Sequence, residues 1–103
     1  MTKEIESNKR KIEKTKDGIY AMRNNYLDTD RFDYLLNAFI EVMNGRIAFC
    51  EELVNFINDK ENTTQDIESA KEKIREVLKE NLTLKEKWVL HFEKEKNKVK
   101  VIS

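Results

Sequence analysis

The chain has 103 residues, the size of a single domain, and 39% of them are apolar and 39% charged. Its single cysteine excludes a disulfide framework and a cysteine-based zinc cluster, and no apolar run approaches the roughly 18 residues of a membrane-spanning helix. The charged segment 1–16 lacks the apolar stretch of a signal peptide. We therefore expect a cytoplasmic protein, in the host cytoplasm if a phage encodes it.

Basic and acidic residues are equal in number, 20 of each, but unevenly distributed along the chain. Residues 1–31 have a net charge of +2, residues 32–66 of −5 and residues 67–103 of +3. An acidic middle between two basic ends favours charge complementarity within the fold over a field directed at a partner. The abundance of lysine, asparagine and isoleucine, whose codons are AT-rich, indicates an AT-rich genome such as that of a low-GC bacterium or its phages.

The first predicted helix covers about residues 3–26. Its apolar side chains recur every seven residues, with flanking charges repeating beside them, as in a helical bundle. Gly18 weakens the middle of this helix by roughly 1 kcal/mol relative to alanine. A turn at 27–29 follows, where Asp28, Thr29 or Asp30 can cap the next helix. The seven-residue row consists of Ile5, Ile12, Ile19 and Tyr26.

The second predicted helix, about residues 30–59, has the clearest pattern, because its apolar side chains span an arc of about 200° on a helical wheel. One neighbouring helix cannot cover so wide an arc, so we expect the helix to be wrapped on two sides. Cys50 lies at the centre of the arc and is predicted to be a core residue rather than a nucleophile. One edge of the arc consists of Leu35, Val42, Phe49, Leu53 and Phe56.

The third predicted helix, about residues 65–98, follows a polar loop at 58–64 and can be capped by Thr63 or Thr64. Thr83 could cap a separate fourth helix, but the apolar face keeps its phase through that point, so we predict one continuous helix. Residues 99–103 are predicted to form an extended tail. The sequence thus predicts a single all-α domain, an antiparallel three-helix bundle of long helices, with self-association left open.

Polar side chains interrupt the apolar faces near the middle of the predicted bundle. Arg46 lies within the arc of the second helix, Asn81 and Lys85 lie within that of the third, and Asn8 and Thr15 lie on the seam of the first. Antiparallel pairing about the 58–64 loop places Arg46 level with residues 77–81, so we predict a buried polar layer of Arg46, Asn81 and Lys85. Such a layer fixes helix register, the favoured interpretation, or lines a small pocket.

The sequence offers no arrangement typical of an active site. His91 has no second histidine with which to bind a metal and is predicted to be a half-buried structural residue beside Trp88. No glycine-rich loop could hold a phosphate, and the carboxylates of the second helix fit a solvated face better than a metal site. We therefore predict a non-enzymatic protein with no catalytic, cofactor or metal site.

The remaining function is binding to another macromolecule through helix faces. We expect a protein partner that the chain modulates or inhibits, as small phage or mobile-element factors of the host-defence inhibitor type do. A homodimer is a further expectation. The alternative is a nucleic-acid-associated protein that uses the basic segments near the termini. The predicted partner-binding residues, large side chains off the core stripes and charges beside the first seam, are Lys9, Lys16, Tyr20, Arg23, Tyr34 and Leu90.

Overall fold

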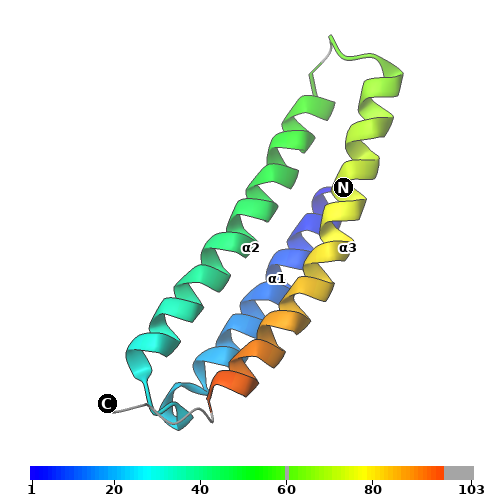
Figure 1. Cartoon of the computed structure of the whole chain (residues 1–103). Coiled ribbons are helices and arrows are strands. Elements are labelled where there is room, and N and C mark those ends of the chain that lie inside the picture. The colour runs from blue at the N-terminus through cyan, green and yellow to red at the C-terminus, as the bar shows by residue number, and fades with distance from the viewer. Residues whose placement is uncertain (60, 97–103) are drawn as a thin grey trace.

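The computed structural model describes residues 1–59 and 61–96 and shows three helices packed against one another (Figure 1). These are α1 (Thr2–Tyr20), α2 (Thr29–Ile57) and α3 (Thr64–Glu95), with a single 3₁₀ turn, η1 (Arg23–Asn25), between the first two. Cross-contacts show that α2 and α3 run antiparallel, because Phe39 lies beside Trp88 and Arg46 beside Asn81. The prediction of an all-α antiparallel three-helix bundle is confirmed.

Side-chain caps define where α2 and α3 begin. The Oδ1 atom of Asp28 accepts a hydrogen bond of 3.1 Å from the backbone N–H of Arg31. At α3, the Oγ1 atom of Thr63 accepts one of 3.2 Å from the backbone N–H of Asp66. Each cap satisfies a backbone donor that the first turn of a helix leaves without a partner. Of the alternatives open in the sequence, Asp28 and Thr63 are therefore the N-caps.

The first helix is shorter than predicted. It ends at Tyr20 rather than at about residue 26, and Tyr26 has an extended backbone with φ −86° and ψ 134°. The Tyr26 ring is nevertheless buried, with its centroid 4.8 Å from that of Phe32 and 6.4 Å from that of Phe92. Its hydroxyl donates a 2.5 Å hydrogen bond to the Phe92 carbonyl oxygen. These tertiary contacts outweigh the seven-residue periodicity, so Tyr26 joins the core from outside the helix.

The third helix is continuous, as predicted, because α3 runs without a break through Thr83. Its last described turn ends at Glu95, with Lys96 as the C-cap. The expected helical end at 97–98 and the extended tail at 99–103 lie outside the described residues.

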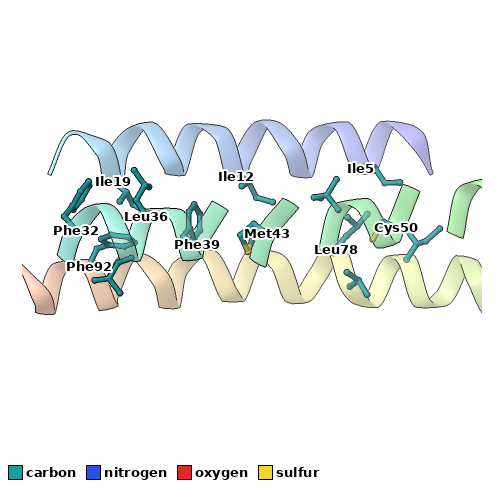
Figure 2. Close-up of a cluster of buried hydrophobic side chains, with 14 of the residues drawn as sticks. Ile5, Ile12, Ile19, Phe32, Leu36, Phe39, Met43, Cys50, Leu78 and Phe92 are labelled. Atoms are coloured by element: carbon teal, nitrogen blue, oxygen red, sulfur yellow. The ribbon is translucent and has the colours of Figure 1, made fainter. Parts of the chain in front are cut away.

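The core is one cluster of apolar side chains that extends along the bundle axis between the three helices (Figure 2). Three isoleucines of α1, Ile5, Ile12 and Ile19, belong to this cluster, as the seven-residue spacing predicted. Cys50 is also fully buried in the core, as predicted, and burial raises the pKa of its thiol. The side chains contributed by α2 and α3 include Phe32, Phe39, Met43, Ile47, Ile74, Leu78 and Phe92.

The three helices differ in length. At 19, 29 and 32 residues they are about 28, 43 and 48 Å long, so α2 and α3 extend beyond the start of α1 (Figure 1). Near the 58–64 loop, Leu53, Val54 and Ile57 are therefore only partly buried. Over the described ranges, no helix combines the length and apolarity that a membrane crossing requires.

Candidate interaction surfaces

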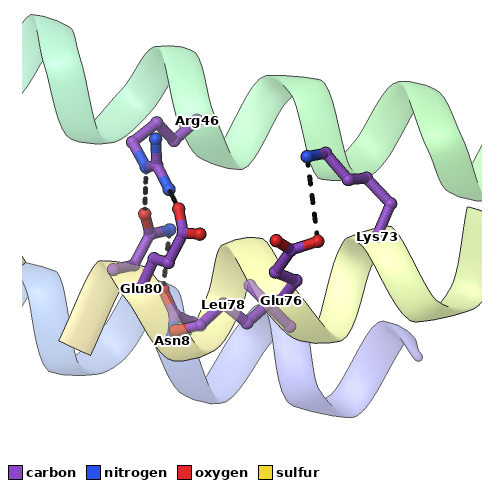
Figure 3. A network of polar contacts seen from close by, with 7 residues as sticks. Asn8, Arg46, Lys73, Glu76, Leu78 and Glu80 are labelled. Carbon is purple, nitrogen blue, oxygen red and sulfur yellow. Dashed lines mark hydrogen bonds and ion pairs between the residues drawn. The ribbon is translucent and has the colours of Figure 1, made fainter. Parts of the chain in front are cut away.

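A polar network crosses the bundle at mid-height (Figure 3). The Nε–H of Arg46 donates a 2.5 Å hydrogen bond to Oδ1 of Asn81, and its Nη2 group bonds Oε2 of Glu80 at 2.7 Å. The fully buried Asn81 donates from Nδ2 to Oδ1 of Asn8 at 3.2 Å, and Asn8 donates from Nδ2 to the Leu78 carbonyl oxygen at 3.1 Å. The network therefore ties all three helices together at one level.

The composition of this network differs partly from the predicted layer. The antiparallel register correctly placed Arg46 beside Asn81, but Lys85 does not take part. Lys85 lies one turn further along α3, where it is partly buried and lines a surface groove. Thr15, which the seam also suggested, donates instead to the backbone carbonyl of Lys11 at 2.8 Å. Glu80 was missed because it lies off the apolar face and reaches Arg46 from the surface.

The buried polar groups of the network are satisfied within the fold. Among the described residues, every buried side-chain nitrogen and oxygen has a hydrogen-bond partner. The Nε and Nη2 groups of Arg46 bond Asn81 and Glu80, and the amide of Asn81 bonds that of Asn8. A set of groups that satisfies itself fixes the register of the helices and resembles the buried asparagine of a coiled coil more than a pocket.

The histidine and the acidic side chains form no cluster suited to metal binding within the described ranges. His91 is partly buried, and its ring lies edge-on to Trp88 at a centroid distance of 6.3 Å. This placement matches the half-buried position expected from the sequence. The contact with Trp88 gives the imidazole an aromatic neighbour.

An apolar row on α2 is left partly open to solvent. Val42, Phe49 and Phe56 recur every seven residues and remain 43, 45 and 41% exposed. They follow Leu35, which is buried, along the same edge of the helix. The prediction that neighbours wrap α2 on two sides holds, since α1 and α3 both pack on it. The two neighbours nevertheless leave this edge of the wide arc exposed.

This row borders a groove between α2 and α3 that is separate from α1. Gly45, Arg46, Val77 and Lys73 line it together with Val42 and Phe49, and no lining residue comes from α1. Lys73 and Glu76 form an ion pair of 3.8 Å beside it (Figure 3). The first helix borders a different groove, with Ile40 and Asn44 of α2. The sequence signal for the row was present in the seven-residue spacing, but only the packing showed which edge of the arc stays open.

Three of the predicted partner-binding residues are solvent-exposed. Tyr20, Tyr34 and Leu90 are 61, 69 and 61% exposed, on α1, α2 and α3 respectively. They lie on three different helices.

The three predicted cationic contacts take part in ion pairs within the chain. Lys9 bonds Glu51 of α2 at 3.0 Å, and Lys16 bonds Glu13 at 2.7 Å. Arg23 donates two hydrogen bonds, of 2.9 and 3.0 Å, to the Asp33 carboxylate. They connect η1 to α2 and lower the pKa of the Asp33 carboxyl. These cations thus serve the complementarity within the fold that the charge distribution indicated.

Comparisons with protein-family models, with curated proteins and with solved structures each gave no significant match.

Proposed function

We propose that this chain is a non-enzymatic interaction protein that binds a partner protein through the exposed row of α2 and thereby modulates or inhibits it. The observation that carries the proposal is the row Val42, Phe49 and Phe56, in which each side chain is more than two-fifths exposed at helical spacing. A contiguous apolar row beside a groove is typical of a protein-binding surface, whereas scattered apolar side chains are not. Tyr34 and Leu90 are further proposed contacts.

A photo-crosslinking amino acid at position 49, in the chain expressed in its native host, tests the proposal. The same probe at the exposed, polar position Asn37 of α2 is the matched control. We expect one protein to crosslink at position 49 and not at 37. The purified partner should then lose about tenfold in affinity for Phe49→Ser, because a large aromatic contact is removed. Equal crosslinking at both positions, or equal affinity of the variant, would contradict the proposal.

A second copy of the chain is another occupant of the row that this surface accommodates. Sedimentation velocity over a range of concentrations distinguishes the two cases. A dimer that Phe49→Ser converts to a monomer assigns the row to self-association. Loss of activity in the captured partner on addition of the wild-type chain, and not of Phe49→Ser, supports the inhibitor role, including that of a phage or mobile-element factor.

A further inference from the structure

The groove between α1 and α3 is lined by an excess of cationic side chains. No residue of α2 takes part in it. Among its described lining residues the one carboxylate is that of Glu4, which pairs with the Met1 amino group at 2.8 Å. One lining cation, Lys71, pairs with Glu68 at 3.7 Å. The other lining cations, which have no ion pair within the described residues, are Lys3, Lys11, Lys14, Arg75, Lys79 and Lys85.

These six cations, here called the α1–α3 cation set, differ from those on the α2 side of the bundle. There, Lys9, Arg23 and Arg46 each bond a carboxylate of another element. In the α1–α3 groove the positive charges lie along two helices that run parallel, and within the described residues none of the six forms an ion pair. A groove lined by one sign of charge focuses the field and attracts a ligand of the opposite sign.

The floor of this groove is apolar. Leu82 is half-buried between Lys79 and the α1 residues that line the same hollow, and it does not belong to the side chains packed on the core. Met22 and Val89 continue the floor toward the other end and are also partly buried. The groove therefore combines an apolar strip with cations on both sides.

We propose that the α1–α3 groove binds an acidic amphipathic helix of a partner protein, with the apolar side chains of that helix on the floor and its carboxylates against the cation set. This surface lies on a different face from the α2 row, so the inference does not depend on the function proposed above. The stretch from Arg75 to Lys85 covers about 15 Å, which corresponds to about three turns of a docked helix.

The apolar floor favours a protein over a nucleic acid. A phosphate backbone would satisfy the cations but leave Leu82 and Val89 without an apolar contact. Single-stranded nucleic acids bind on aromatic platforms, and no aromatic side chain is among the described residues that line this groove. Both surfaces together would allow the chain to hold two segments at once.

The test uses a labelled synthetic peptide of about three heptads with leucine at the a and d positions and glutamate at e and g. Fluorescence anisotropy measures its affinity for the full chain. Reversal of two groove cations, Lys11→Glu with Lys79→Glu, should weaken binding about tenfold or more. The matched control is Lys87→Glu with Lys94→Glu, which makes the same charge change at exposed cations outside the groove and should weaken binding far less.

Two further variants distinguish binding to the apolar floor of the groove from binding to the α2 row on the other face. Leu82→Ser should weaken peptide binding severalfold with little effect on the melting temperature, whereas Phe49→Ser should leave peptide binding unchanged. Equal losses in the groove and control charge variants would overturn the proposal, because binding would then follow net charge alone. Tighter binding of a short DNA duplex, lost in the groove variant but kept in Leu82→Ser, would assign the groove to nucleic acid instead. Loss of the peptide in Phe49→Ser would place it on α2.

Discussion

The two ends of the bundle are built from the same kinds of residue but are closed to different degrees. At the end formed by η1 and the close of α3, Tyr26, Phe32 and Phe92 pack edge to face, with Phe32 and Phe92 centroids 5.5 Å apart. At the 58–64 end, where α1 does not reach, Phe56 stays 41% exposed and Leu53 is only partly buried. Val42 and Phe49 are as exposed as Phe56 although α1 reaches their level, so the exposure of Phe56 reflects its edge of α2, whereas the partial burial of Leu53 reflects the missing third helix.

The largest expected effect comes from removing one aromatic ring at each end. Phe92→Ala should destabilise the protein by about 3–5 kcal/mol, because Phe92 is fully buried and its loss leaves a cavity. Phe56→Ala should cost about 1 kcal/mol or less, since its ring already meets water. Urea denaturation of both variants measures the two changes in the free energy of unfolding. Equal losses would show that the ends are equally closed.

A smaller effect should appear at high pH at the aromatic end alone. Burial, with the nearby carboxylates of Glu95 and Glu93, raises the pKa of Tyr26 to about 12. The folded state therefore binds more protons than the unfolded state between about pH 10 and 12, and stability falls as pH rises through that window. The loss attributable to Tyr26 should reach about 2–3 kcal/mol.

The control for this pH dependence is Tyr26→Phe, which has no hydroxyl to ionise. Unfolding free energies of the wild type and the variant, measured from about pH 9 to 12, should converge as the wild type loses its advantage. Parallel curves would mean that the Tyr26 hydroxyl does not titrate differently in the folded and unfolded states.

Removing one member of the polar network tests how strongly the network holds α1 against α2 and α3. Asn81→Ala removes the acceptor of Arg46 and the donor to Asn8, so it should cost about 1–3 kcal/mol. The exposed Thr83→Ala, two residues along α3, should change stability by less than about 0.5 kcal/mol. Amide hydrogen exchange in Asn81→Ala should accelerate most in the first turns of α1, and unchanged exchange there would argue against a register role.

The smallest effect concerns the backbone of α1. A methyl group at Gly18 meets no neighbouring atom, and the residue lies inside the helix, so Gly18→Ala should stabilise the protein by up to about 1 kcal/mol. Gly45→Ala in α2 has equal space and serves as the comparison. Thermal unfolding followed by circular dichroism measures both. A lower melting temperature for Gly18→Ala would indicate that α1 is held in a strained position.

Helix positions and local signals were readable from the sequence because they depend on neighbours in the chain. The unbroken α3 follows from the phase of its apolar face, and the caps at Asp28 and Thr63 were among the alternatives that side-chain hydrogen bonding allowed. The position of Arg46 beside Asn81 also followed from the sequence, because two helices joined by a short loop pair in a definite register. The early end of α1 did not follow, because the contacts of Tyr26 with Phe92 join residues far apart in the chain.

The surfaces were harder to predict than the core. The apolar row of α2 has a clear seven-residue period. A seam covered by a neighbouring helix has the same period, so the period could not show whether the row is buried or exposed. The α1–α3 cation set had no visible pattern, because its members come from two helices that lie side by side only in the fold. The partner contacts predicted at Tyr20, Tyr34 and Leu90 stay predictions.

By itself, the sequence determined that this chain forms long amphipathic helices with a wide apolar arc on the middle one and a polar interruption at mid-bundle. Only the tertiary structure decided which edge of that arc is covered and which cations are left without a carboxylate. The physical reason is that helix formation depends on contacts within a few residues, whereas burial and charge pairing depend on which faces of separate helices meet.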